Sequence, residues 1–202
     1  MSRQADAIEI LIKRLAKLPG MGSRSARRVA LHLLTDKEKN LSPLQAALQD
    51  AQDQVVTCET CGMLDTQNPC GICADTKRDH GKICVVQSVG DVWAMERTGF
   101  YNGVYHILGG VLSALDGVGP DQLSVRHLTT RVQQNADINE IIIALGATVD
   151  GQATAHYLVD HIRHINRDMT LSHLAYGVPI GGEVEYLDDS TLATAMKSRS
   201  AF

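Results

Sequence analysis

Four of the five cysteines fall into two close pairs, and this spacing constrains the fold more than any other feature of the chain. Cys58 and Cys61 form one Cys-x-x-Cys pair, and Cys70 and Cys73 form a second, with eight residues between the inner cysteines. Together they supply four thiolates, which complete the closed tetrahedral site of structural zinc. A redox-active pair has no need of a second pair, and four sulfur ligands leave no open position for catalysis. We therefore expect one structural zinc ion per chain.

The segment that carries these cysteines is short and polar. Residues 57–78 are rich in Cys, Gly, Thr, Asp and Pro, and such a segment cannot bury a core of its own, so a metal staple is expected. The fifth cysteine, Cys84, lies in an apolar run at 82–86 and is predicted to be an inert core residue. Five cysteines used in this way do not indicate a disulfide framework, which favours a reducing compartment.

The termini and hydropathy agree with a cytoplasmic location. No run of 18 or more apolar residues is present, so no membrane span is expected. Residues 1–6 are charged and are not followed by the apolar segment and small-residue cleavage site of a secretory signal.

The N-terminal quarter is predicted to be helical. Apolar residues recur at helical spacing over 7–18, and a second amphipathic helix is expected over about 24–34. Ser42 followed by Pro43 is typical of a helix cap with proline at the first helical position, and predicts a third helix to about residue 56.

The turn between the first two helices has the features of a phosphate-binding hairpin. Gly20 and Gly22 flank one apolar residue and permit a tight turn with exposed N–H groups. The following helix adds unpaired N–H groups and the positive end of its dipole. Arg24 and Arg28 are four residues apart and share one helix face. These four residues are predicted to bind the DNA backbone without reading sequence; the alternative is a helical corner whose glycines serve packing alone.

Charge is distributed unevenly along the chain. The net charge is −4, but residues 1–57 hold nine basic and six acidic side chains, whereas the remainder holds ten basic and 17 acidic ones. The net charge is therefore +3 for residues 1–57 and −7 for the remainder. This difference favours two surfaces with different partners, although ordinary surface variation would give a similar split.

The second half alternates short apolar runs with helical stretches. Such alternation predicts an α/β fold with a small parallel sheet. Strands are expected at 83–86, 104–108 and 141–145, and helices at 91–98, 123–134 and 153–165. One or two further strands are expected in the tail, 172–187, around Pro179 and Gly181-Gly182.

This α/β half resembles a Toprim domain, the fold of topoisomerases and primases. Such enzymes hold magnesium with a glutamate at the end of the first strand and an Asp-x-Asp pair after a later one. Here Gln87 stands at the first position, and residues 146–152 offer Asp150 alone. Asp91 is the one other acid close in sequence to that strand end. One or two carboxylates do not make a convincing two-metal site, so we interpret the sheet as a binding scaffold rather than an enzyme.

The order of hairpin, four-cysteine segment and Toprim-like sheet resembles the RecR family of recombination mediators from end to end. The matching runs are residues 18–22, 58–73, 115–120, 148–154 and 177–183. The resemblance implies four parts: a helical helix-hairpin-helix region (1–56), a four-cysteine zinc motif (57–78), a Toprim-like α/β domain (79–175) and a C-terminal strand and helix segment (176–202).

The resemblance also implies a function and partners. Family members are non-enzymatic, form dimers and ring-like tetramers, and act with RecO and RecF to place RecA on gapped DNA. The family's DNA-facing positions match Arg24 and Arg28, and its acidic partner-binding region points to Asp91 and Asp150. Many members have a glutamate where this chain has Gln87, which alters any contact made there. A protein of this kind is expected to be cytoplasmic and nucleoid-associated when it acts on DNA.

Two other hypotheses remain open at this point. One is a Toprim-type magnesium-dependent enzyme that cuts or synthesises nucleic acid. The other is a zinc-stabilised interaction module with no DNA contact.

Overall fold

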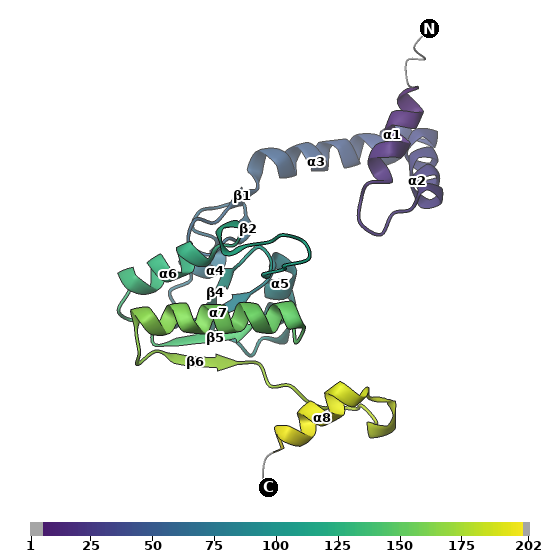
Figure 1. Ribbon diagram of the computed structural model, residues 1–202. Coiled ribbons are helices and arrows are strands. Elements are labelled where there is room, and N and C mark those ends of the chain that lie inside the picture. Colours follow the sequence, from purple (N-terminus) through teal and green to yellow (C-terminus); the bar gives the residue numbers. More distant parts are fainter. Residues whose placement is uncertain (1–5, 200–202) are drawn as a thin grey trace. The chain divides into compact units, whose positions relative to one another are not determined.

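The computed structural model describes residues 6–199, which divide into two units after Val55 (Figure 1). Residues 1–5, which figured in the expectations about the N-terminus, lie outside the described part of the chain. The first unit contains α1 (Ala7–Leu15), α2 (Ser23–Thr35), a π-helical turn (Lys37–Leu41) and α3 (Ser42–Gln54). None of the helices described has both the length and the apolar character needed to cross a bilayer.

The first unit has a small core. Ala26, Ala30 and Leu33 are its buried side chains, and all three lie on one face of α2, which packs against α1. Six isoleucine and leucine side chains of the same unit are more than two-fifths exposed: Ile8, Ile10, Leu18, Leu31, Leu44 and Leu48. The helices of this unit therefore leave these apolar side chains partly exposed to solvent.

The third helix begins earlier than the sequence predicts. The chain is already helical at Lys37, and the carboxylate of Asp36 accepts a 3.1 Å hydrogen bond from the amide of Lys39. The amide of Ser42 donates to the carbonyl oxygen of Lys37, which closes a wide π turn. The predicted cap at Ser42 is wrong: Pro43, which has no amide hydrogen, follows this turn without interrupting the helix.

The second unit combines a parallel sheet with a small knuckle, which is the four-cysteine segment at 57–78. Its elements are β1 (Val56–Thr57), β2 (Leu64–Asp65), α4 (Gly71–Ala74), β3 (Asp79–Val86), α5 (Val89–Thr98), β4 (Gly103–Ile107), a 3-10 turn (Pro120–Gln122), α6 (Val125–Gln134), β5 (Glu140–Ala144), α7 (Val149–Ile165), β6 (Thr170–His173), a second 3-10 turn (Val184–Tyr186) and α8 (Asp189–Lys197). The expected α/β fold is confirmed.

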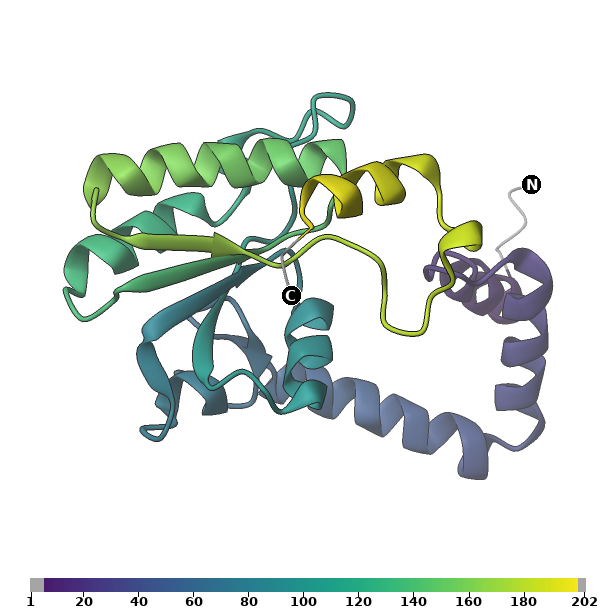
Figure 2. The same ribbon diagram turned by 90° about the horizontal axis from the view of Figure 1, so that it is seen from below.

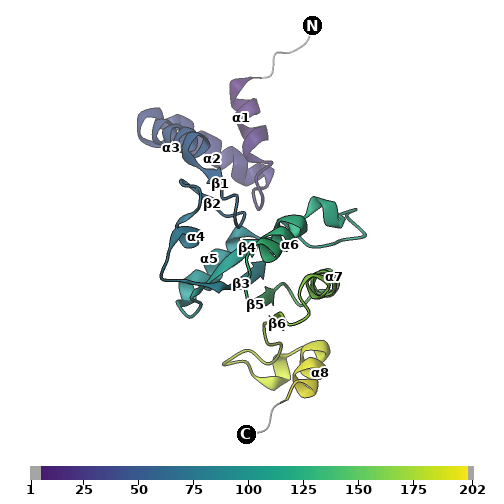
Figure 3. The same ribbon diagram turned by 90° about the vertical axis from the view of Figure 1, so that its left-hand side faces the viewer.

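The larger sheet has the strand order β4-β3-β5-β6, and every neighbouring pair is parallel. Helix α5 covers one face, and α6 and α7 cover the other (Figures 1, 2 and 3). Right-handed crossovers require this arrangement, because the strand order runs one way from β3 to β4 and the opposite way from β5 to β6. The carboxyl ends of β3 and β5 therefore form the switch point at which such sheets usually bind ligands.

Successive side chains of β3 pack on opposite faces of the sheet. Ile83 and Val85 belong to the core beneath α6 and α7, and Cys84 and Val86 belong to the core beneath α5. All four side chains are fully buried, as expected for the central strand of a sheet covered on both sides.

The tail differs from the prediction. Its strand, β6, ends at His173, and no strand of residues 6–199 lies around Pro179. That region is a tight turn, in which the amide of Gly182 donates to the carbonyl oxygen of Pro179 over 2.9 Å and Gly181 has a φ of 81°. Proline cannot donate to a strand ladder, which accounts for the difference. The tail ends in α8, whose N-cap Asp188 accepts from the amide of Thr191.

Candidate metal centre and nucleic-acid interface

The four predicted cysteines converge on one point. The sulfur atoms of Cys58, Cys61, Cys70 and Cys73 all lie within 4.8 Å of one another, and Cys61 and Cys70 are 3.5 Å apart. Sulfur ligands of a tetrahedral zinc ion, each about 2.3 Å from the metal, stand roughly 3.8 Å apart. The cluster is therefore positioned to bind a metal ion, and its all-thiolate donor set fits structural zinc.

Backbone turns direct these sulfur atoms inward. The amide of Gly62 donates to the carbonyl oxygen of Cys58, and that of Ala74 donates to Cys70, each over 2.9 Å. Gly62 has a φ of 81°, which glycine adopts without strain. Backbone amides also point at the sulfur atoms: Cys70 donates to the Sγ of Cys58 over 3.3 Å.

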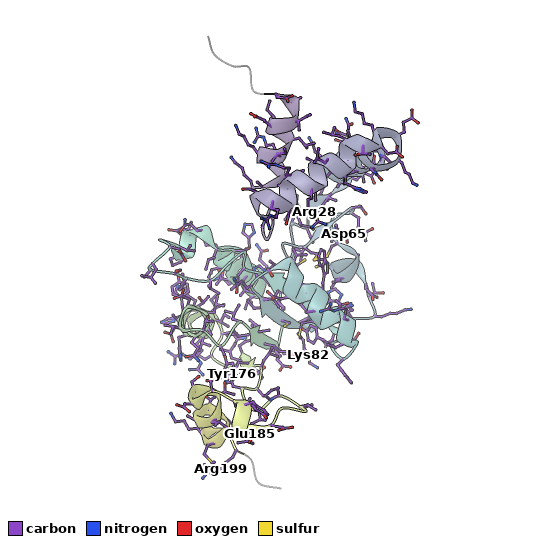
Figure 4. The ribbon with its side chains drawn as sticks, turned by 90° about the vertical axis from the view of Figure 1, so that its right-hand side faces the viewer. Arg28, Asp65, Lys82, Tyr176, Glu185 and Arg199 are labelled. Atoms are coloured by element: carbon purple, nitrogen blue, oxygen red, sulfur yellow. The ribbon has the colours of Figure 1, made fainter. Side chains whose placement is uncertain are left out.

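Asp65 supports the second of these turns from β2 (Figure 4). Its carboxylate accepts a 2.8 Å hydrogen bond from the amide of Gly71, the residue that follows Cys70. Nothing in the local sequence marks Asp65 as part of the site. The short antiparallel pairing of β1 with β2, in which Thr57 is opposite Leu64, places it there.

The electrostatics of the cluster favour a bound cation. A hydrogen bond to Cys73 and burial raise the pKa of the Cys61 thiol, and burial raises the pKa of Cys70 to about 11. Cys61 and Cys70 therefore resist ionisation by themselves, whereas at Cys58 burial is outweighed by backbone hydrogen bonds, which lower its pKa to about 7. A divalent cation removes this resistance by binding all of them as thiolates.

The knuckle and α6 share the outer edge of β4. The amide of Ile107 donates to the carbonyl oxygen of Cys61 over 2.8 Å. The guanidinium of Arg131, on α6, donates to the carbonyl oxygen of Tyr105 over the same distance. These two bonds satisfy backbone groups that an edge strand otherwise leaves open.

A polar groove of about 470 Å³ lies between the knuckle and α6. Glu59 and Thr60 line it from the knuckle, and His80 lines it from β3. The lining residues from α6 and its end are His127, Thr130, Arg131, Gln134 and Asn135. None of these side chains was predicted from the sequence, because they come from three segments far apart in the chain.

The glycine hairpin has the geometry of a type II turn. The amide of Met21 donates to the carbonyl oxygen of Leu18 over 3.0 Å, with Pro19 second in the turn and Gly20 third, at a φ of 76°. Gly22 is the N-cap of α2 and supplies no side-chain cap. The first amides of α2 are consequently left for an external acceptor.

Arg24 and Arg28 are both exposed. They lie opposite the buried face of α2 formed by Ala26 and Ala30, because residues two apart on a helix are separated by about 200°. Neither arginine forms an ion pair with an acid among residues 6–199. Two free guanidinium groups therefore stand on the helix that begins at the hairpin.

The switch point of the sheet brings together the Toprim-like positions. Gln87 directly follows β3 and is exposed, and Asp91 and Asp150 lie in the first turns of α5 and α7. The carboxylate of Asp91 has a structural role, because it accepts from the amide and the hydroxyl of Ser88 over 2.8 and 2.9 Å in a capping box. Asp150 is half-buried, and no such bond constrains its carboxylate in the described part of the chain.

Successive parts of the chain match four known protein families. Residues 8–52 match the family described as RecR, helix-hairpin-helix, and residues 55–75 match the zinc finger domain of RecR, which has four cysteine ligands. Residues 81–175 match the Toprim domain, and 177–200 match RecR, C-terminal.

Curated relatives are similar along almost the whole chain. Recombination protein RecR of Mesorhizobium japonicum is 55% identical over 195 residues, which cover 96% of each chain. The protein of the same name from Parvibaculum lavamentivorans is 54% identical with the same coverage. That of Phenylobacterium zucineum is 56% identical over 192 residues, covering 95% of this chain and 94% of the relative.

Proposed function

The chain belongs to the RecR family of recombination proteins, and from this premise we propose that it is a zinc-stapled, non-enzymatic mediator that binds DNA during recombinational repair. It acts with RecO and RecF to help load RecA on gapped DNA, in the cytoplasm and on the nucleoid. Its parts are the hairpin region (1–56), the zinc motif (57–78), the Toprim-like domain (79–175) and the C-terminal segment (176–202).

One observation carries the DNA-binding proposal: a glycine turn opens onto uncapped helix amides, with exposed Arg24 and Arg28 on the same helix. Amides at a helix N-terminus and guanidinium groups are the donors that phosphate oxygens accept from. A Cβ atom at Gly20 or Gly22 would meet no other atom of the protein within 4 Å, so neither glycine is required for packing, and both leave the backbone open to a phosphate. These groups bind the backbone and therefore do not distinguish sequences.

A single hairpin offers few phosphate contacts, so the active species is an oligomer, a dimer or a ring-like tetramer. Non-specific DNA binding has a Kd of about 10⁻⁴–10⁻⁶ M at physiological salt, and several hairpins on one DNA raise the overall affinity. The six exposed isoleucine and leucine side chains of the first unit support self-association, because an isolated monomer would leave them in water.

The Toprim-like sheet serves partner binding rather than phosphoryl transfer. Asp91 and Asp150 provide acidic groups at the switch point for a basic partner surface. Gln87 cannot supply the third carboxylate that a magnesium site of this kind uses. Magnesium- or manganese-dependent cleavage or synthesis that is lost in Asp150→Asn would support the enzyme alternative instead.

The experiment for DNA binding is a salt titration with random-sequence DNA. The double variant R24A/R28A should bind more weakly to all sequences and should have a shallower salt dependence, by about one in log–log slope for each phosphate that is no longer neutralised. The matched control is K37A/K39A, which removes the same charge from exposed positions of the same unit. If both double variants weaken binding equally, the arginines act only through the net charge of the unit and not as a hairpin site. If neither variant weakens binding, DNA binds to another surface of the protein.

A further inference from the structure

We propose that the polar groove between the zinc knuckle and α6 is a second DNA-phosphate site, centred on Arg131 and His127 and separate from the glycine hairpin. The inference rests on the proposed DNA-binding function and adds a contact that the family resemblance did not indicate. The groove holds about 470 Å³ and is built within the second unit.

The donors in the groove match the acceptors of a phosphodiester. A guanidinium, two imidazoles, two hydroxyls and two amides line it, and no aliphatic or aromatic hydrocarbon side chain is among its lining residues. Phosphate oxygens accept from all of these donors. None of the lining side chains is an apolar anchor of the kind that seats a buried peptide side chain. The backbone of a polymeric nucleic acid is therefore the ligand that fits.

Arg131 is held in position before any ligand arrives. One of its Nη atoms donates to the carbonyl oxygen of Tyr105 over 2.8 Å, which fixes the guanidinium at the edge of β4. Its remaining donors have no hydrogen-bond or ion-pair partner among residues 6–199. A guanidinium fixed in this way loses less conformational entropy when it binds an anion.

The local charge departs from that of the surrounding unit. Residues 58–202 carry a net charge of −7, yet α6 contains Arg126, His127 and Arg131 and no carboxylate. Of these, Arg126 is paired with Asp121 over 2.7 Å and does not line the groove. The single carboxylate among the lining residues is Glu59, on the knuckle side.

Glu59 makes the proposal testable by a gain of affinity, which misfolding cannot mimic. Its carboxylate repels a phosphate in the groove, so Glu59→Gln should tighten DNA binding about two- to fivefold at low salt. The opposite change, Thr130→Glu, places a negative charge on the opposite wall of the groove and should weaken binding by at least as much.

The matched controls lie on the same helix but do not line the groove. Gln133→Glu adds the same charge as Thr130→Glu at an exposed position outside the groove, and Arg126→Gln removes a charge that Asp121 already pairs. Gln133→Glu should change DNA affinity less than Thr130→Glu does, and Arg126→Gln should change it less than Arg131→Gln does. Arg131→Gln is measured as well, together with its zinc content and melting temperature, because it alters the bond to Tyr105.

The measurement is fluorescence anisotropy with a random oligonucleotide across a salt series, using the full-length zinc-loaded protein. Opposite shifts for Glu59→Gln and Thr130→Glu, with unchanged controls, support the site. Unchanged affinity in both overturns it, even if R24A/R28A still weakens binding, in which case the hairpin proposal stands alone.

Inorganic phosphate, matched in ionic strength with chloride, separates the sources of the anion. Perturbation of the NMR signals of His127 and Arg131 by the oligonucleotide supports the DNA site. If inorganic phosphate perturbs them while the oligonucleotide does not, the groove is a free-phosphate site and the DNA proposal fails.

Discussion

The backbone amide of Ile107 donates a 2.8 Å hydrogen bond to the carbonyl oxygen of Cys61. This bond joins the last residue of β4 to a metal ligand, so the metal-binding knuckle completes the outer edge of the Toprim-like sheet. The packing agrees with it, because a Cβ atom on Gly62 would lie only 3.3 Å from the carbonyl oxygen of Ile107. Metal binding and the order of this sheet edge are consequently coupled.

Cys61→Ser should lower the zinc content and the stability together. Structural zinc contributes directly to the folding of a segment without a core, so we expect a loss of about 3 kcal/mol or more in the free energy of unfolding. Hydrogen exchange at the Ile107 amide should accelerate, while that at Val85, in the central strand, should change least. Cys84→Ala is the matched control, because Cys84 is fully buried away from the cluster. It should keep one zinc per chain, and a parent without zinc would contradict the prediction.

An ion pair also joins Arg78, the residue before β3, to Glu96 on α5. One Nη of Arg78 donates to the carboxylate of Glu96 over 3.0 Å, and the hydroxyl of Tyr105 donates to the same oxygen over 2.7 Å. Burial opposes ionisation of Glu96, but these two hydrogen bonds outweigh it and hold the pKa of Glu96 below its ordinary value of 4.5.

Glu96→Gln should therefore destabilise the fold by about 2 kcal/mol at pH 7, because it removes the nearer countercharge of the Arg78 guanidinium and leaves only Asp75, 3.9 Å from its Nε. In the parent, the ion pair contributes this free energy above pH 4.5 and the contribution is lost as the pH falls through the lowered pKa of Glu96 in the folded protein. The difference in the free energy of unfolding between the parent and Glu96→Gln should therefore narrow at acidic pH. Urea unfolding at several pH values measures this. Asp121→Asn, which breaks the exposed pair with Arg126, should cost less than about 0.5 kcal/mol. Equal losses in both variants would show that burial of the pair has no effect.

The sequence predicts the local features of this fold well. The ligand set follows from cysteine spacing, since a Cys-x-x-Cys turn brings both sulfur atoms to one point. The three main strands follow from short runs that are almost entirely apolar, as parallel strands covered on both faces require. Helix starts are less accurate: α5 begins at Val89 rather than Asp91, because Ser88 and Asp91 form the capping box.

Long-range side-chain pairs leave no such local signal. Arg78 and Glu96 are 18 residues apart, and Arg131 is 26 residues from Tyr105. No periodicity connects them, so the ion pair and the groove become visible only after the sheet is assembled. The edge strand β6 is short and carries two half-buried and two exposed residues, and for this reason its sequence does not resemble that of the central strands.

The buried side chain of His106 should make the free energy of unfolding depend on pH in a second way. Its side chain is 1% exposed, its Nε2 bonds the carbonyl oxygen of Ser124 over 2.9 Å, and its Nδ1 has no partner in the described part of the chain. Burial lowers the pKa of His106 to about 4, and the charges of Arg131 and His127 act in the same direction. The folded protein therefore keeps this imidazole neutral at pH values where an unfolded chain protonates it.

Stability should consequently fall as pH decreases from about 6.5 to 4, by about 3 kcal/mol from this group once the window is crossed. His106→Asn, which cannot take up the proton, should flatten this part of the stability curve while being less stable at pH 7. The exposed His161→Asn is the matched control and should follow the parent. The free energy of unfolding measured across this range decides the matter, and parallel curves for parent and His106→Asn would contradict it.

Replacing the two hairpin glycines, Gly20 and Gly22, by alanine should affect the stability of the first unit differently. Gly20 has a φ of 76°, in the left-handed region, so Gly20→Ala strains the turn and should destabilise the first unit by about 1 kcal/mol. Gly22 has a φ of −77° and open space around it. Gly22→Ala should therefore leave stability within about 0.5 kcal/mol of the parent.

Their effects on DNA should not follow their effects on stability. If the amides after Gly22 bind a phosphate, a methyl group at this position obstructs the close approach, and Gly22→Ala should weaken DNA binding several-fold in a protein that melts like the parent. Gly22→Ser is the informative companion, because serine is a favourable N-cap whose hydroxyl bonds the free amides and competes with the phosphate. It should stabilise α2 while weakening DNA binding. Thermal melts and anisotropy titrations on the same preparations measure both quantities. Full DNA affinity in Gly22→Ser would mean that these amides do not face the DNA.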